Sequence, residues 1–268
     1  WPLDQYPGVG LSGRAKLLRE EGQLRLSGVD GTINGKGIRS GRFFGQLPDL
    51  TYLASGSITV TLAVDDLGQF TGPLGLVTAA ALPARLSANV VGAPQPGSPL
   101  FVVFDGVSDD MQLQINGQVR PSDKKTTFDL NSHFQADDIA KVSKIFGLAI
   151  PLDGPLSLET ELRHDASQDA KTVSGTVRMS SNNLNAAAQG IFSWPLRSGN
   201  QVSLQFEAPS LAHLSRWLPG DYLDPGPLRF KSNFRIDDEN VPSGYFAATL
   251  GDNDLSGDAR IQGIHLGK

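Results

Sequence analysis

The stretch "LRFKSNFRI", from Leu228 to Ile236, alternates apolar and polar side chains. Leu228, Phe230, Phe234 and Ile236 occupy alternate positions, with charged or polar residues between them. Successive side chains of a β-strand point to opposite faces, so a period of two gives a strand with one apolar and one polar face. Half-buried strands of this kind are typical of antiparallel sheets rather than of doubly wound parallel sheets. We therefore predict a mainly β fold.

The same alternation recurs along most of the chain. The connections are rich in Gly, Asn, Asp and Ser, as in "INGKG" at 33–37, which favours tight hairpin turns. The further segments that predict strands are "ITVTLAV" (58–64), "LQIN" (113–116), "TFDLNSHF" (127–134), "LSLETEL" (156–162), "VSGTVRM" (173–179), "QVSLQF" (201–206) and "FAATL" (246–250).

Two short segments have helical periodicity instead. In "DDIAKVSKIF" (137–146) and "PSLAHLSRWL" (209–218) the spacing of apolar residues gives one apolar stripe on a helix. Asp137 is a candidate N-cap for the first helix, and Pro209 suits the first turn of the second. Helices of about three turns are unstable alone, so each must pack on the sheet. The residues expected to make this packing are Ile139, Val142, Phe146, Leu211, Leu214 and Trp217.

The chain also contains a repeat. The segment "FQADDIAKVSKIFGLAIPLDGPL" (134–156) aligns without gaps with "FEAPSLAHLSRWLPGDYLDPGPL" (206–228), 72 residues later. Strand, helix, "GPL" and further strands follow in each copy, so we place two units at about 126–197 and 198–268 within a region that spans 98–268. A third "GPL" at 72–74 indicates a decayed copy in a β-rich N-terminal segment, 1–97.

Repeats of this size stack side by side and join their apolar faces into one continuous surface. The predicted architecture is therefore an elongated, curved antiparallel β-sheet groove, built from repeats, with two short amphipathic helices.

The motifs of 98–268 resemble those of the AsmA-like family of Gram-negative envelope proteins. That family combines an amphipathic segment, a Gly-Pro-Leu entry to a strand, and an "L-G-x-N-D-L-x-G" turn into the next strand. In the earlier copy of the turn, Asn183 replaces the Asp and Ala186 the second Gly. The residues that match the turn are Leu250, Gly251, Asn253, Asp254, Leu255 and Gly257, with Asn182 and Leu184 in the earlier copy.

The resemblance implies a periplasmic protein that an N-terminal helix, preceding Trp1, tethers to the inner membrane. It also implies a long groove lined by apolar residues, which moves phospholipids to the outer membrane or acts in outer-membrane assembly. The chain begins at Trp1 rather than Met, as expected of a processed form or of a piece of a longer protein.

The predicted strands carry more apolar surface than two short helices can cover. The remainder must close on itself, bind lipid or bind a partner. Because an acyl chain gains about 0.8 kcal/mol per buried CH₂, we predict that the groove binds or conducts phospholipid acyl chains. The residues expected to line it are Phe128, Leu130, Leu158, Val177, Leu204, Phe230 and Phe234.

Two alternatives remain open. In the first, the protein is a structural module whose sheet edges dock a neighbouring repeat or a component of outer-membrane assembly, without lipid transport. In the second and weaker one, it is a β-solenoid that binds or hydrolyses sugars, which would require exposed aromatic platforms. The tryptophans available for such platforms are Trp1, Trp194 and Trp217.

Composition and motifs argue against several other functions. A net charge of -5 and a single adjacent lysine pair, Lys124-Lys125, argue against nucleic-acid binding. The absence of cysteine rules out disulfides and thiolate metal sites. The sequence contains no run of 18 apolar residues, so it predicts no membrane-spanning helix.

No motif predicts catalysis, a metal or a cofactor. "DNDLSGD" (252–258) has acidic residues at calcium-loop spacing, but Gly263 stands where a bidentate Glu is needed, so we interpret it as a polar turn. The four histidines lack zinc-site spacing, and "GKGIRSG" (35–41) lacks that of a dinucleotide loop. The pairs at 109–110 and 237–238 are interpreted as turns rather than catalytic carboxylates. We predict that the protein is not an enzyme.

Overall fold

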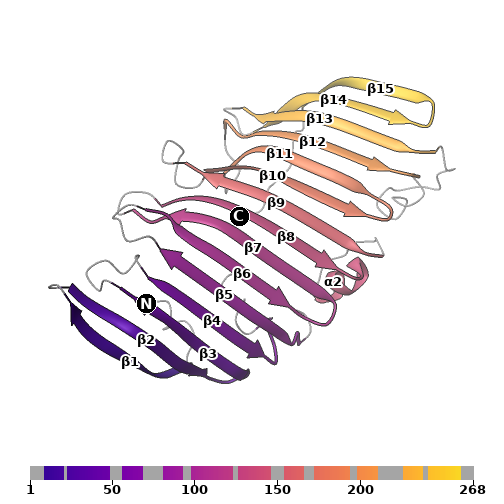
Figure 1. The fold of residues 1–268 in the computed structure, drawn as a ribbon. Coiled ribbons are helices and arrows are strands. Elements are labelled where there is room, and N and C mark those ends of the chain that lie inside the picture. The colour runs from indigo at the N-terminus through magenta and orange to yellow at the C-terminus, as the bar shows by residue number, and fades with distance from the viewer. Residues whose placement is uncertain are drawn as a thin grey trace. The chain divides into compact units, whose positions relative to one another are not determined.

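The computed structural model describes residues 9–20, 23–48, 56–68, 81–92, 98–122, 126–145, 154–165, 172–193, 198–210, 226–237 and 241–260. Strands account for most of them, which confirms the mainly β prediction (Figure 1). The elements are β1 (Gly10–Glu20), β2 (Gln23–Asn34), β3 (Ile38–Leu47), β4 (Ser57–Val64), β5 (Ala84–Gly92), β6 (Leu100–Val107), β7 (Met111–Arg120), β8 (Thr127–Ala136), α2 (Ile139–Ile145), β9 (Leu156–His164), β10 (Thr172–Ser181), β11 (Asn185–Ser193), β12 (Gln201–Ala208), β13 (Leu228–Ile236), β14 (Pro242–Leu250) and β15 (Asn253–Arg260).

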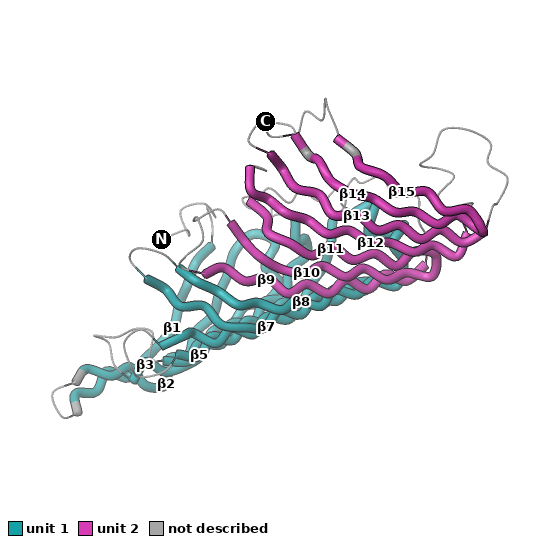
Figure 2. Tube along the Cα trace, turned by 90° about the horizontal axis from the view of Figure 1, so that it is seen from above, with its two compact units in different colours: residues 1–150 teal, residues 151–268 magenta. Residues whose placement is uncertain are grey.

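The strands form an open antiparallel meander. Sheet order is the order of the sequence, from β1 to β15. The chain divides into two compact units, Trp1–Ile150 and Pro151–Lys268, which Figure 2 colours separately. Unit 1 holds β1 to β8 and α2, and unit 2 holds β9 to β15.

The helix α2 begins two residues later than predicted and has a different cap. The backbone N–H of Ala140 donates to Asp138 Oδ1 at 2.9 Å, so Asp138 rather than Asp137 is the N-cap. The N–H of Asp137 donates to the carbonyl of Asp110 at 3.0 Å, so Asp137 continues the pairing of β7 with β8 and the helix begins after it. Ile139 and Val142 are buried, as expected of residues that pack against the rest of the unit.

Part of the helix prediction falls outside the described residues. Phe146 is one of these positions. The second predicted helix (209–218) is described only as far as 210, so Leu211, Leu214 and Trp217 also lie outside the described residues. Among the elements that the described residues form, α2 is the single helix.

The "GPL" motif has a local structural reason. Gly154 and Gly226 have φ values of 84° and 98°, a left-handed conformation that glycine adopts without steric cost. The proline that follows stands just before the first residue of β9 or β13, where a missing N–H costs no ladder hydrogen bond. At the second motif the carbonyl of Pro227 accepts from the N–H of Gly251 at 2.9 Å, which ties the strand entry to the β14–β15 turn.

The strands follow the 72-residue period of the sequence. The bounds of β13, Leu228–Ile236, are those of β9, Leu156–His164, displaced by 72 residues. Each of these two strands is entered through its own "GPL" motif. The third "GPL", at 72–74, lies outside the described residues.

The buried residues concentrate at the ends of strands rather than along their middles. In unit 1 they include Val64 and Ala84, which face each other across β4 and β5. In unit 2 they include Ala208 and Ile236, the last residues of β12 and β13. Much of the sheet surface is therefore left accessible.

Candidate functional site

Cross-strand register places the predicted lining residues of unit 2 on one face. Val177 pairs with Ala188, Ala188 with Leu204, and Leu204 with Ser232. Residues that pair directly in an antiparallel sheet share a face. Phe230 and Phe234 flank Ser232 at two-residue spacing on β13, and Leu158 pairs with Met179, two residues from Val177. We call this side the apolar face of unit 2.

Unit 1 has an apolar face of its own. Phe128 and Leu130 of β8 pair with Val119 and Gly117 of β7, and the same row of positions continues through β6, β5 and β4. The apolar residues on these three strands are Ile58, Val60, Leu62, Val64, Ala84, Leu86, Ala88, Val90, Leu100, Val102 and Phe104.

Aromatic rings form a ladder on the apolar face of unit 2. Phe206 and Phe230 stack with ring centroids 4.8 Å apart and an interplanar angle of 20°. Phe230 and Phe246 continue the ladder at 6.4 Å and 14°. Stacked aromatic pairs contribute about 0.5–1.5 kcal/mol beyond the area that they bury. The ladder therefore joins β12, β13 and β14 through side chains as well as through the backbone.

The apolar faces are partly open to solvent. Leu204 is 36% exposed and Leu255, which pairs with Ala248 on the same face, is 64% exposed. In unit 1 Ile58 is 37% exposed. Most of the remaining apolar-face residues are half-buried, because their neighbours on the same face shield them. Such a face leaves room for an apolar ligand.

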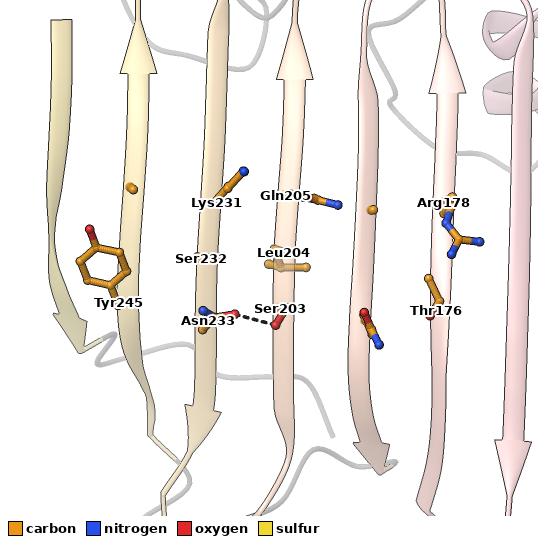
Figure 3. Close-up of a pocket in the computed structure, with 12 residues that line it drawn as sticks. Thr176, Arg178, Ser203, Leu204, Gln205, Lys231, Ser232, Asn233 and Tyr245 are labelled. Atoms are coloured by element: carbon orange, nitrogen blue, oxygen red, sulfur yellow. Dashed lines mark hydrogen bonds between the residues drawn. The ribbon is translucent and has the colours of Figure 1, made fainter.

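The polar face of unit 2 carries a depression of about 420 Å³ (Figure 3). Its residues come from two adjacent rows of the register on β10 to β14. Leu204 and Ser232, which the register assigns to the apolar face, also contribute to the lining. The first row is Arg178, Ala187, Gln205, Lys231 and Ala247, and the second is Thr176, Gln189, Ser203, Asn233 and Tyr245.

The polar face of unit 1 carries a comparable depression of about 460 Å³, in which Arg42 lies beside Thr61 and Ser87. Arg42 Nε donates to Asp30 Oδ1 at 2.9 Å. This hydrogen bond is the main cause that lowers the pKa of Asp30 and raises that of Arg42. Both depressions lie mainly on the polar faces, but apolar-face residues also line them: Leu204 in unit 2, and Leu62 and Leu86 in unit 1.

The described residues give no sign of a metal site. Among the ranges given above, no cluster of three or more histidine and acidic side chains is placed to hold a metal ion. The segment with calcium-loop spacing is instead a two-residue turn, Gly251 and Asp252, followed by β15, in which Asp254 and Asp258 lie on the polar face. Within the same described ranges, no helix has the length and apolar character required to cross a membrane.

Comparisons with protein-family models, with curated proteins and with solved structures find no match to this chain.

The depression on the polar face of unit 2 was not predicted from the sequence. Its signal lies between the apolar positions that predicted the strands: in "LRFKSNFRI" the alternate residues are Arg229, Lys231, Asn233 and Arg235. A period of two defines two faces, and the predicted lining residues all belong to the apolar one.

Proposed function

We propose that the apolar faces bind or conduct phospholipid acyl chains, as in an AsmA-like envelope protein of the periplasm. In this proposal the sheet is one wall of an elongated, curved groove, and an N-terminal helix tethers the full-length protein to the inner membrane. The protein acts without catalysis and contributes to phospholipid transport to the outer membrane and to envelope biogenesis.

One observation carries the proposal: each unit presents a face of apolar side chains that is continuous over several neighbouring strands and only half-buried. An acyl chain laid on such a face gains about 0.8 kcal/mol for each methylene that is fully removed from water. If about ten methylenes are half-covered, the gain is roughly 4 kcal/mol, which is sufficient for reversible holding. The affinity requires no specific polar contact along the acyl chain, which agrees with the largely apolar character of the face.

The test is to purify the whole chain without detergent, extract the lipids that are bound to it and identify them by mass spectrometry. We expect phospholipid in amounts comparable to the protein. A parallel titration with a fluorescent fatty acid should show saturable binding that added phospholipid displaces. Absence of phospholipid together with absence of fatty-acid binding would overturn the proposal.

The alternative, docking through sheet edges, has one observation in its favour. The edge strand β1 is 11 residues long and pairs only with β2 among the described residues. Leu11 and Leu17 on this strand are 54% and 59% exposed. Long edge strands with exposed apolar residues are templates for pairing with another chain. Replacing both leucines with Lys should abolish partner association and leave lipid binding intact if docking is the function.

A further inference from the structure

The depression on the polar face of unit 2 has the composition of a ligand site. Its two rows contain hydroxyl, amide and cationic groups, whereas none of the lining residues is acidic. In Figure 3, Lys231, Gln205 and Arg178 lie in one row, and Tyr245, Asn233, Ser203 and Thr176 in the other. The only hydrogen bond drawn between these side chains joins Ser203 Oγ to Asn233 Oδ1.

The two cations of the depression differ in their partners. Arg178 Nη1 donates to Glu161 Oε1 at 3.0 Å, and Glu161 lies outside the depression on β9. No ion pair joins Lys231 to another of the described residues, and its direct neighbours across the strands, Gln205 and Ala247, are uncharged. The ammonium group of Lys231 is thus left without a carboxylate partner among the described residues, although Glu161 and Asp258 lie next to the two ends of the second row. An unpaired ammonium group attracts carboxylate, sulfate or phosphate groups.

The remaining side chains offer hydrogen-bonding groups beyond those that a simple anion requires. Gln189, Gln205 and Asn233 each offer both a donor and an acceptor, which suits the hydroxyl groups of a sugar. Tyr245 is 49% exposed and presents a ring and a hydroxyl at the end of the second row. Arg178 on β10 and Lys231 on β13 are three strand spacings apart, or roughly 14 Å, so a ligand that touches both has several units.

From these lining side chains we propose that the polar-face depression of unit 2 binds an anionic oligosaccharide, with Lys231 and Arg178 contacting its acidic groups. The amide and hydroxyl side chains of the two rows contact the sugar hydroxyls. The ligand lies across the strands, from β10 to β14. The two rows lie on the opposite face of the same strands from the predicted lipid-lining residues, so this proposal does not depend on the lipid proposal.

The test uses isothermal titration calorimetry with the whole chain and two probes of equal length. One is a linear tetrasaccharide of galacturonic acid, and the other is uncharged maltotetraose. We expect the charged probe to bind, to bind more weakly as salt rises, and to exceed the uncharged probe in affinity. Inorganic phosphate serves as a third probe and is expected to bind far more weakly than the tetrasaccharide.

Two matched lysine variants test whether the charged probe binds at the depression of unit 2. Lys231→Gln should weaken binding of the charged tetrasaccharide about 3- to 5-fold, which corresponds to an exposed charge contact. Lys16→Gln in β1 of unit 1 removes the same charge from an exposed position and should leave the affinity unchanged. Both residues are exposed, so neither substitution should alter the unfolding midpoint.

Three results would overturn the proposal: no binding of the charged probe, equal affinity for the uncharged probe or for phosphate, or equal losses in the Lys231 and Lys16 variants. Lipid retention, measured on the same Lys231→Gln sample, should equal that of the unmodified protein. A failure of the saccharide site is therefore distinguishable from a failure of the lipid-binding face.

Discussion

Phe206 of β12 and Phe230 of β13 are directly paired in register, and their rings stack 4.8 Å apart on the apolar face of unit 2. A slip of one residue between these strands would turn one of the two rings to the polar face. The pair therefore specifies the register of the two strands as well as stabilising them.

A double-mutant cycle with Phe206→Leu and Phe230→Leu should measure this pairing. We expect each single substitution to lower the free energy of unfolding by about 1 kcal/mol, since leucine keeps much of the apolar volume. The coupling between the two positions should be about 0.5–1.5 kcal/mol, the range of stacked aromatic pairs. Chemical denaturation of the four proteins gives the value. A coupling of zero would show that the two rings act independently.

Leu204→Glu should separate a ligand-binding face from a packed core. Leu204 is 36% exposed on the apolar face, so a glutamate there can still reach water and should cost only about 1 kcal/mol of stability. Because a charge on this face opposes contact with acyl chains, phospholipid recovered with the variant should fall severalfold.

The matched control for that experiment is Ile191→Glu. Ile191 is 40% exposed on the adjacent strand β11, but its pairing with Ser174 and Gln201 places it on the polar face. The Ile191→Glu variant carries the same added charge at a similarly exposed position and should retain the bound phospholipid. A Leu204→Glu protein that unfolds outright would instead show that the face is a packed core.

Sequence periodicity predicted the strands well where the alternation is uninterrupted. "ITVTLAV" and "LRFKSNFRI" correspond to β4 and β13 within one residue at either end. Strands β1, β2, β3, β5, β6, β11 and β15 were not among the predicted segments. For β1 to β3 there is a physical reason, since bulges change the phase of the alternation. The pairing of β2 with β3 shifts between Leu26 and Val29, around Gly28, whose φ is 59°. In β3 a similar shift follows Ile38.

The candidate site was predicted only in part. Register groups Leu158, Val177, Leu204, Phe230 and Phe234 on one face because every strand of unit 2 keeps its alternation. The depression on the polar face requires side chains from five strands, and no single segment of sequence contains that set. The groove itself stays a prediction, since alternation defines a face but does not define how the face curves.

Gly244→Ala should destabilise unit 2, whereas Gly257→Ala should not. A Cβ at Gly244 would clash with the backbone oxygen of Asn233 and lie 2.9 Å from Phe234 Cα, so β13 and β14 would have to separate. We expect a loss of about 1–3 kcal/mol, as for overpacking elsewhere. At Gly257 the nearest atom is a ring carbon of Phe246 at 3.6 Å, an ordinary contact. Equal unfolding midpoints for the two variants would contradict this explanation.

The anchoring of α2 should depend on pH at alkaline values. Lys141 Nζ lies 2.5 Å from Asp110 Oδ1, and this hydrogen bond, followed by the charge of Asp110, raises the pKa of Lys141 above its ordinary 10.5. A pKa that is higher in the folded protein means that folding favours the protonated amine. The stabilisation is therefore fully present below pH 10.5 and is lost as pH rises through the folded-state pKa.

Unfolding midpoints of the unmodified protein and of Lys141→Met, measured from about pH 8 to pH 12, test this dependence. The difference between the two should be constant up to about pH 10 and shrink above it, because methionine keeps the aliphatic stem without the titrating amine. The contact is solvent-exposed, with 53% of the Lys141 side chain accessible, so raising the salt concentration should also reduce the difference. A difference that is independent of pH would mean that Lys141 acts through packing of its stem alone, and the ion pair would then contribute nothing to holding α2 in place.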